Sequence, residues 1–531
     1  MKWFLMICLT FLAVGVLRSA DQTCQSCHQQ VQSNCELTCQ QCHISTKANN
    51  VTSSTDHPVG IANSSQPEWW AEKCQACHAE VINRFRKSLH YTSMGVIDQT
   101  RFLFGKNDQL FQTQPDAWQK LKHVKGVKSP STAGVVDHLL AGKCLSCHFA
   151  ADRRGDVAGR RHAAGCASCH VELDQKTGKP LHGHRFQKKI ADTVCLSCHS
   201  GNRVGADYHG FFERDYYYQY QQPFGSRPWF GAFQHHLVKD VHQQAGLQCV
   251  DCHKEHVEQS RMPRFEGEQP SVRCQDCHGG FNEKPSPNAA KGPVFNSASV
   301  AHQSFHQKIR CSACHAQWVF QDYGLHLFLD QSSNYEMWQD YLWQGDGEVT
   351  HLLLEELSKP EELRNPAFSS NKLSGQKMLG IWYQAWTFRR WEDPILGRDT
   401  QGRISVLRPL YQYFITFVDS LDQVWLDSQK PVRKDGKIGW NWDAYVPHTI
   451  GRRGRNCESC HLNAKAVGLG IRQNPSDSVA QQITMPAEPV LPNSRLLNAQ
   501  EQQQLLKKRA LYKYWRTKAF QQNGIKKLME K

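Results

Sequence analysis

The chain has 531 residues, a formal charge of +14 and 22 cysteines, and this length predicts three or four domain-sized units. Many cysteines in a secreted chain usually indicate a disulfide framework, but 20 of the 22 fall into ten repeats of Cys-x-x-Cys-His. Disulfides need no histidine after every second cysteine, and zinc knuckles need not end in histidine each time. The pattern therefore argues against both and indicates covalent attachment of c-type haem.

The N-terminus, residues 1–20, is typical of a secretory signal peptide. Lys2 gives it a positive start, and residues 3–17 form an apolar run too short to span a bilayer comfortably. The expected cleavage site near Ser19 or Ala20 is imperfect because Arg18 stands where a small residue is preferred, so an uncleaved anchor is the alternative. No other stretch is long and apolar enough to cross a membrane. We expect a soluble or peripheral protein in the periplasm or on the cell surface.

The ten motifs follow, nine of them within residues 21–320 and the last within 446–470. We expect thioether bonds to haem vinyl groups at Cys24, Cys27, Cys39, Cys42, Cys74, Cys77, Cys144, Cys147, Cys166, Cys169, Cys195, Cys198, Cys249, Cys252, Cys274, Cys277, Cys311, Cys314, Cys457 and Cys460. The expected proximal iron ligands are His28, His43, His78, His148, His170, His199, His253, His278, His315 and His461. So dense a set leaves little chain for an apolar core, so haem itself is expected to fill much of it.

Residues 321–445 contain no motif and are rich in tryptophan. Segments 381–388 and 411–418 are predicted strands, and 399–403 and 419–423 are predicted turns. This region is therefore expected to be a β-containing insert. It serves either as a structural cap over the last haem or as a platform for a partner or substrate.

The tail, residues 471–531, begins as a proline-rich loop and ends in a predicted basic helix over 499–521. Asn498 with Glu501 resembles a capping box at the helix start. The helix is either solvated and packed on the surface or a docking face for an acidic partner or membrane surface.

The positive charge does not indicate a nucleic-acid partner. Each haem carries two propionates, so ten haems would add a charge of about −10 when oxidised and about −20 when reduced. The excess of lysine and arginine is better explained as counter-charge for propionates than as a nucleic-acid-binding surface.

Seventeen histidines remain after the ten proximal ones, enough for a second histidine on every iron. An iron with two histidine ligands has no open position, which favours electron transfer over catalysis. The best distal candidates, by their place near motifs, are His90, His242, His302, His306 and His448. Weaker candidates are His57, His162, His184, His209 and His256. Surface or supporting roles are expected for His123, His138, His182, His235, His236, His326 and His351.

Residues 322–326 have the spacing of a haem motif, with His326 in the histidine position, but both cysteine positions are occupied by other residues. This segment is either a lost haem site or a chance match.

Three stretches resemble the multihaem cytochrome c family of tetrahaem cytochrome c modules, octahaem tetrathionate reductase and hydroxylamine oxidoreductase. They are Cys74-Gln-Ala-Cys-His with Ser88-Leu-His90, Asp240-Val-His242 before Gly246-Leu-Gln-Cys-Val-Asp-Cys-His253, and Pro447-His448 before Cys457-Glu-Ser-Cys-His461. The resemblance covers roughly residues 24–320 and 445–465. It implies a mainly α multihaem cytochrome c fold with much irregular structure, a haem-filled core and stacked haems that form an electron path.

The resemblance leaves catalysis open, and no catalytic residue is assigned. The nitrite reductase branch of the family replaces a motif histidine by lysine, whereas all ten motifs here end in histidine. We therefore expect an electron conduit, whose redox partners are a quinol dehydrogenase or other cytochromes and whose membrane contact is at most peripheral. An oxidoreductase acting on a small nitrogen or sulfur compound at one open haem is the alternative, and a filament subunit is a third. In the second case Tyr208, His209, Tyr216, Tyr217, Tyr218 and Tyr220 would line the site; otherwise they pack on haem faces.

Overall fold

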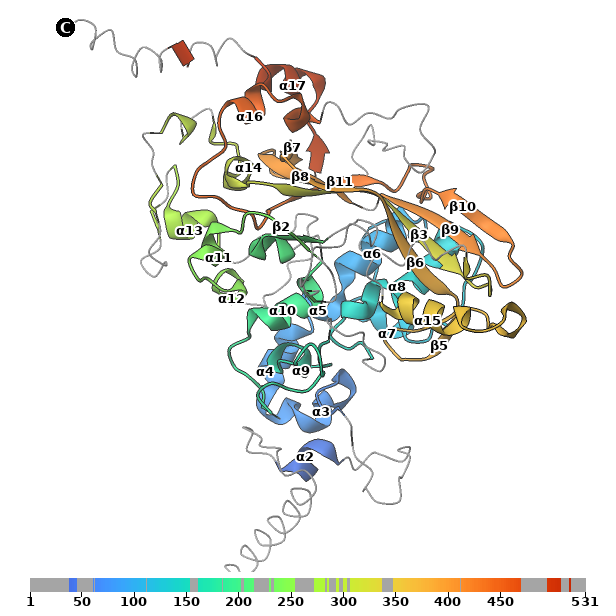
Figure 1. Cartoon of the computed structure of the whole chain (residues 1–531). Helices are drawn as coiled ribbons and strands as arrows, with labels where there is room; N and C mark the ends of the chain where they lie inside the picture. The colour runs from blue at the N-terminus through green and yellow to red at the C-terminus, as the bar shows by residue number, and fades with distance from the viewer. Residues whose placement is uncertain are drawn as a thin grey trace, which may run out of the picture.

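A column of short helical turns runs along one side of the molecule, and a strand-rich region lies beside its upper half (Figure 1). The computed structural model describes residues 38–44, 61, 63–110, 112–152, 161–183, 185–201, 205–213, 229–230, 234–253, 272–281, 284–285, 293–295, 299–302, 306–336, 347–410, 412–468, 494–507 and 515–516. The predicted signal peptide and the first motif, residues 24–28, lie outside these parts.

Eight motifs form helical turns, most of only four or five residues. These turns are α2 (Cys39–His43), α4 (Gln75–Phe85), α9 (Ala167–His170), α10 (Asp192–His199), α12 (Cys249–Cys252), α13 (Cys274–His278), α14 (Cys311–His315) and α16 (Glu458–His461). Two of them carry their own cap inside the motif. The Asp251 and Asp276 carboxylates accept from the backbone N–H groups of Gln248 and Arg273, at 2.7 Å each. Such bonds hold the first turn of a helix too short to be stable alone.

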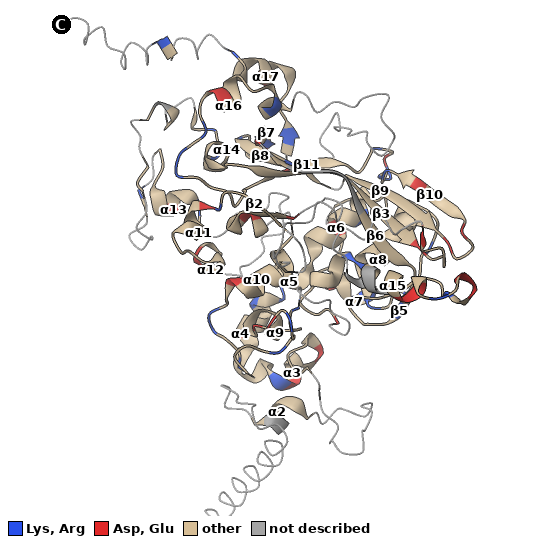
Figure 2. Cartoon of the chain, in the orientation of Figure 1, with Lys and Arg blue, Asp and Glu red and all other residues tan. Residues whose placement is uncertain are grey.

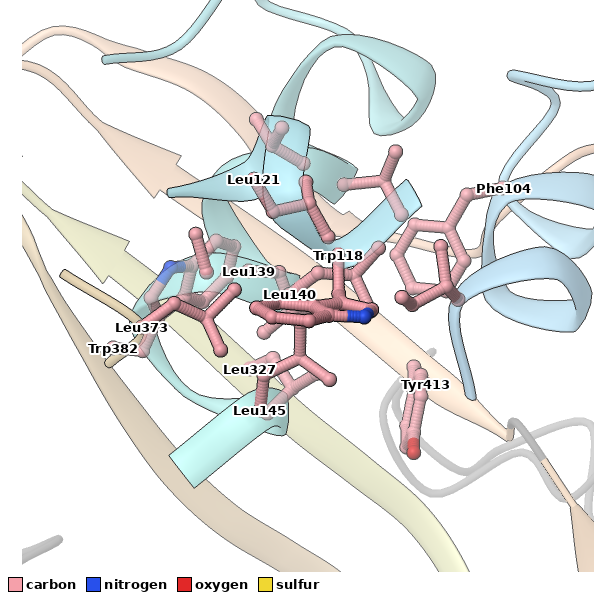
Figure 3. Close-up of a cluster of buried hydrophobic side chains, with 14 of the residues drawn as sticks. Phe104, Trp118, Leu121, Leu139, Leu140, Leu145, Leu327, Leu373, Trp382 and Tyr413 are labelled. Atoms are coloured by element: carbon pink, nitrogen blue, oxygen red, sulfur yellow. The ribbon is translucent and has the colours of Figure 1, made fainter. Parts of the chain in front are cut away.

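Three helices between the third and fourth motifs, α6 (Met94–Leu103), α7 (Ala117–Leu121) and α8 (Thr132–Gly142), supply much of a large apolar core. The Ser131 hydroxyl caps α8 by accepting from the Gly134 N–H at 3.1 Å. Trp118 lies among leucines of α8 and of a neighbouring strand (Figure 3). Regular structure therefore extends beyond the motif turns.

The strand region contains a first sheet of order β10–β9–β3–β6. Its strands are β3 (Val319–Asp330), β6 (Ile381–Glu392), β9 (Tyr413–Val418) and β10 (Val424–Gln429). β3 is antiparallel to β6 and parallel to β9. Leu325, Leu327 and Leu329 alternate toward α8, while Phe328 on the opposite face of β3 lies in a second buried cluster.

A second sheet has the order β11–β8–β7–β12. Its strands are β7 (Ile395–Asp399), β8 (Ile404–Leu410), β11 (Asn441–Tyr445) and β12 (Ser494–Leu496). The predicted turns are confirmed: the Asp399 Oδ1 accepts from the Gln401 and Arg403 N–H groups, and Asp419 does the same for Leu421 and Gln423. The predicted strand at 381–388 is confirmed within β6, and the one at 411–418 is confirmed as β9, which begins at Tyr413.

The expectation of a mainly α fold is wrong. Motif turns contribute few helical residues each, while β3 and β6 reach 12 residues and the two sheets span most of 319–445.

The remaining elements are η1 (Pro67–Trp69), α3 (Trp70–Lys73), α5 (Leu89–Thr92), η2 (Cys144–Cys147), η3 (Ala206–His209), β1 (Phe211–Glu213), β2 (Gln234–His236), α11 (Val241–Gln244), η5 (Val300–His302), α15 (Gly347–Leu357), η8 (Glu361–Leu363), β4 (Phe368–Ser370), β5 (Lys377–Leu379) and η9 (Ala464–Val467).

The tail helix begins where predicted but is shorter than expected. α17 (Ala499–Leu505) starts with the reciprocal Asn498–Glu501 capping box, at 2.9 Å in both directions, and ends at Leu505. Residues 508–514 and 517–531 lie outside the described parts. Within the described residues, we find no helix with the length and apolar character needed to cross a membrane.

His138, expected at the surface or in support of a site, is fully buried in α8. Its Nδ1 accepts from the Trp382 indole N–H at 3.0 Å, so its Nε2–H donates to the Leu379 carbonyl at 3.0 Å. Burial lowers the pKa of His138 to about 4, although the Leu379 bond acts the other way. The ring joins α8 to the first sheet as a neutral group.

We expect this histidine to make stability depend on pH. The unfolded ring protonates near pH 6.5 and the folded ring only near 4, so the stabilisation is complete above 6.5 and is lost as the pH falls from 6.5 to about 4. The loss should reach about 3 kcal/mol. Urea unfolding at pH 7.5 and 4.5 should show a smaller loss in His138→Gln than in wild type, whereas exposed His123→Gln should behave as wild type. An unchanged pH dependence in His138→Gln would contradict this assignment.

Candidate haem sites

Each helical motif turn fixes its histidine relative to the two cysteines. The amide of the motif histidine donates to the carbonyl of the first cysteine four residues earlier, for example His78 to Cys74 and His253 to Cys249 at 2.9 Å, and His170 to Cys166 at 3.2 Å. One helical turn then brings the imidazole and both sulfurs to the same side. This is the local arrangement that a haem held by two thioethers and one histidine requires.

Backbone carbonyls orient the rings of five motif histidines and of the distal candidate His306. Six ring Nδ1–H groups donate to carbonyls at 2.6–3.3 Å: His43 to Ile61, His170 to Gln187, His278 to Pro293, His306 to Ala301, His315 to Gly451 and His461 to Leu505. A bond at Nδ1 fixes the tautomer and leaves Nε2 as the ligand nitrogen. The residues present therefore fit an iron ligated through Nε2.

Four of the five best distal candidates face a motif histidine. The distances between ring centres are 6.2 Å for His90 and His199, 6.0 Å for His242 and His278, 6.2 Å for His448 and His253, and 6.4 Å for His306 and His461. A metal–imidazole bond of about 2.0 Å, with about 1.1 Å more to the ring centre, separates two ligand rings by about 6.2 Å. All four pairs therefore have the spacing needed to hold one iron between them. The fifth candidate, His302, stacks on Phe295 at 4.3 Å.

Burial keeps several of these rings neutral, which is the form that binds metals. Burial lowers the pKa of His199 to about 4, and the charges of nearby His90, His253 and His448 lower it further. Burial likewise lowers the pKa of His253, followed by the effects of His448 and His90. The sixth and seventh motifs, with their facing histidines, therefore lie next to each other.

The cysteines of successive motifs are neighbours, so the motif turns form one line. The thiols of Cys195 and Cys249 lie within hydrogen-bonding distance of each other, and so do those of Cys274 and Cys311. Weaker electrostatic contacts join Cys74 to Cys166, Cys169 to Cys195, Cys252 to Cys274, and Cys314 to Cys460. The order is therefore third, fifth, sixth, seventh, eighth, ninth and tenth motif. Figure 1 shows the same succession from α4 and α9 through α10, α12, α13 and α14 to α16. We call this set the motif line.

The fourth motif, residues 144–148, lies beside this line. Cys147 contacts the Cys198 carbonyl at 3.9 Å, and Cys198 contacts the Cys147 carbonyl at 3.7 Å, so its neighbour is the sixth motif. Its turn, η2, is a 3₁₀ helix, and the His148 amide donates to Leu145 rather than to Cys144.

His148 does not fit the ligand role in this conformation. Its Nε2–H donates to the Tyr91 carbonyl at 3.0 Å, and its Nδ1 accepts from the Ala150 N–H at 3.2 Å. The ring is 4% exposed and packs 4.7 Å from both Trp118 and Phe149. Both ring nitrogens are thus engaged by the backbone within the apolar core.

A short segment, residues 448–451, serves three sites. The His448 ring faces His253, the Ile450 N–H donates to the Asp240 Oδ2 at 2.8 Å beside His242, and the Gly451 carbonyl accepts from His315. Asp207, itself buried, accepts from the His448 N–H at 3.0 Å. We call residues 448–451 the bridging segment, because it links the seventh, eighth and ninth motifs.

The second sheet anchors the last two motif turns. Arg310, next to Cys311, donates to the buried Asp399 carboxylate at 2.6 Å. Burial raises the pKa of Asp399, but the bonds from Arg310 and Arg403 outweigh it and hold that pKa below its usual value.

The tenth turn depends on α17, whose Leu505 carbonyl orients His461. Arg398 and Arg495 both donate to Glu501 of this helix, at 2.7–2.9 Å. The Arg495 bonds are the main reason that the pKa of Glu501 falls to about 2, so the carboxylate stays charged and the helix stays attached to β7 and β12.

Other candidates are not brought together with a motif histidine by the contacts described. His162 donates to the neighbouring Ala163 carbonyl, and His182 pairs with Glu172. His209 packs against Trp229, and His326 of β3 packs against Phe414 of β9. His235 and His236 lie on β2, and His351 lies on α15. Residues His57, His184 and His256 lie outside the described parts.

Tyr208 belongs to the packing around the bridging segment. Its hydroxyl donates to the Leu247 carbonyl at 2.6 Å, and its ring meets His448 edge-on at 6.3 Å. Burial, then the charge of Asp240, raises its pKa, so it stays protonated. The other tyrosines of the candidate wall, residues 216–220, lie outside the described parts.

Sequence reasoning overlooked the groups that orient the rings. The carbonyl acceptors leave no side-chain signal. Asp240 left one, since a short acidic residue two positions before a histidine, as in Asp240-Val-His242, can cap the turn that carries the ring. Asp207 left none, because the histidine that it contacts, His448, is 241 residues away.

Among known proteins, the family profile described as Cytochrome c3 matches residues 241–322. This range holds the seventh, eighth and ninth motifs with His242, His302 and His306. Neither the curated proteins nor the solved structures contain a match. The match supports a multihaem cytochrome c with covalently bound haem c that functions in electron transfer.

His148 offers a direct test of the fourth motif. His148→Phe keeps the packing volume but leaves the Tyr91 carbonyl and the Ala150 N–H without their ring partner. We expect a loss of about 1–3 kcal/mol in unfolding free energy of the holoprotein, measured by urea unfolding. The exposed His182→Phe should change stability by less than about 0.5 kcal/mol. Loss of a low-spin haem signal in His148→Phe would show instead that the ring leaves this pocket to bind iron.

Proposed function

We infer that this protein is a multihaem c-type cytochrome that conducts electrons one at a time along the motif line. The main observation in support is that four motif histidines on this line each lie opposite a second histidine, with 6.0–6.4 Å between the ring centres. Haem, when bound, supplies an iron that changes between the ferrous and ferric states. Two histidines on one iron leave no position for a substrate, which favours conduction over catalysis.

The chain's own residues would carry out distinct tasks. The 20 motif cysteines would hold ten haems. The motif histidines would be proximal ligands, with the exception of His148 while the backbone holds its ring. His90, His242, His306 and His448 would be distal ligands of the sixth, eighth, tenth and seventh haems. His302, which lies just before the ninth motif and near His315, would serve the ninth. Backbone carbonyls at Nδ1 would set the ring planes.

The setting we propose is the periplasm or the cell surface, with a quinol dehydrogenase or other cytochromes as redox partners. Its support is the signal-like sequence of residues 1–20. Figure 2 shows lysine and arginine interspersed with aspartate and glutamate over the described elements. Such mixing agrees with counter-charge for propionates rather than with a surface for nucleic acid.

A second function, reduction or oxidation of a small nitrogen or sulfur compound, is favoured by one observation. The fourth motif lies beside the line rather than within it, and His148 is held by the backbone. A haem attached there would have an iron outside the through path, where an exogenous ligand could bind.

Electron paramagnetic resonance of the oxidised holoprotein tests the conduit. Wild type should show low-spin ferric haem, and His90→Ala should convert about one haem to high spin because His199 loses its facing ligand. His123→Ala, a matched change at an exposed histidine, should leave the spectrum unchanged. An unaltered His90→Ala spectrum would contradict the assigned pairing. A high-spin signal in wild type that nitrite or sulfite abolishes would favour the second function.

A further inference from the structure

Asp240 is a buried carboxylate placed between α11 and the bridging segment. Only 2% of the residue is exposed. Its Oδ1 accepts from the His242 backbone N–H and from the His242 Nδ1–H, each at 2.8 Å. Its Oδ2 accepts from the Ile450 N–H at 2.8 Å, and the Val241 N–H donates to the Ile450 carbonyl at 2.8 Å. The carboxylate is therefore held by three donors from two segments.

His242 thus differs from the six site histidines whose Nδ1 meets a backbone carbonyl. A carboxylate is a stronger, charged acceptor than a carbonyl. It draws the Nδ1 proton toward itself and makes the opposite nitrogen, Nε2, a stronger electron donor. That nitrogen belongs to the ring whose centre lies 6.0 Å from the centre of His278.

We propose that Asp240 is a positioning residue that lowers the reduction potential of the haem held by Cys274, Cys277 and His278. This rests on the proposed function, because it takes His242 and His278 as the two ligands of that iron. A more basic ligand stabilises ferric over ferrous iron, and a buried negative charge beside the site acts in the same direction.

The position of this haem gives the effect a consequence for conduction. The eighth motif lies between the seventh and the ninth on the motif line, through Cys252 and Cys311. An electron that passes along the line must occupy this site. Lowering its potential makes electron transfer into this site less favourable and transfer out of it more favourable, so Asp240 would affect how readily electrons cross from one half of the line to the other.

Asp207 provides a matched comparison. It is equally buried, at 1% exposure, and accepts from the Gly205, Tyr208 and His448 N–H groups of the backbone. Its carboxylate is 4.0 Å from the His448 Nδ1, beyond hydrogen-bond distance. Removal of its charge therefore tests the effect of a buried carboxylate without a bond to the ring.

The test is a spectroelectrochemical titration of holoprotein carrying Asp240→Asn or Asp207→Asn, with the haem count of each variant checked by intact mass. In Asp240→Asn we expect one component to become at least tenfold easier to reduce, which is about 59 mV for a one-electron couple. In Asp207→Asn the shift should be several-fold smaller. The electron paramagnetic resonance of one low-spin component should change in Asp240→Asn alone.

Equal shifts in the two variants, or none in either, would overturn the proposal while leaving the conduit intact. If Asp240→Asn does not accumulate, Asp240→Glu decides, since it keeps the charge but displaces the acceptor. It should shift the same single component by a smaller amount, and an unchanged titration would overturn the proposal. A haem count far below ten in wild type would instead contradict the proposed function itself.

Discussion

The hydrogen bond from the motif histidine's amide to the first cysteine's carbonyl is the constraint on which the sites depend. It closes one helical turn, and that turn alone carries the imidazole to the side of both sulfurs. Because four or five residues suffice, the chain can repeat the unit many times without building a deep pocket for each. The fourth motif shows the reverse case. There the bond goes to Leu145 instead of Cys144, the turn tightens to a 3₁₀ helix, and His148 turns into the apolar core.

Short turns cannot position one another, and the rest of the fold does so. The bridging segment brings groups from one stretch of backbone to the seventh, eighth and ninth motifs, although it follows them by more than a hundred residues. The second sheet anchors the ninth turn through the Arg310–Asp399 pair, and α17 orients His461 of the tenth. The second sheet, the bridging segment and α17 therefore position the later motifs, while β3 and β6 pack with Trp118 and α8 in one apolar core.

The sequence alone was sufficient where the signal is local. Motif turns, the strands at 381–388 and 411–418, their aspartate turns and the Asn498–Glu501 capping box all depend on neighbouring residues, and the structure contains them. His90, His242, His306 and His448 were singled out because each lies near a motif, and the structure places each opposite the histidine of a motif. Their ligation of iron remains a prediction.

Long-range features were not predictable in this way. The mainly α expectation failed because motif density suggested that haem would replace an apolar core, whereas α8 packs on a sheet nearly two hundred residues later in the chain. His138 bonds to Trp382, 244 residues away, and His148 bonds to Tyr91, 57 residues away. No spacing rule reports such contacts. The order of the motif line likewise emerges only from cysteines that meet in space.

The central claim, that facing histidines each hold an iron and that these irons follow the motif line, is tested most directly by an anomalous-scattering map of holoprotein crystals at the iron edge. The account predicts one iron between the rings of each pair, His90 with His199, His448 with His253, His242 with His278 and His306 with His461, in that spatial succession from α10 to α16. Irons located away from these pairs, or pairs with no iron between their rings, would contradict it.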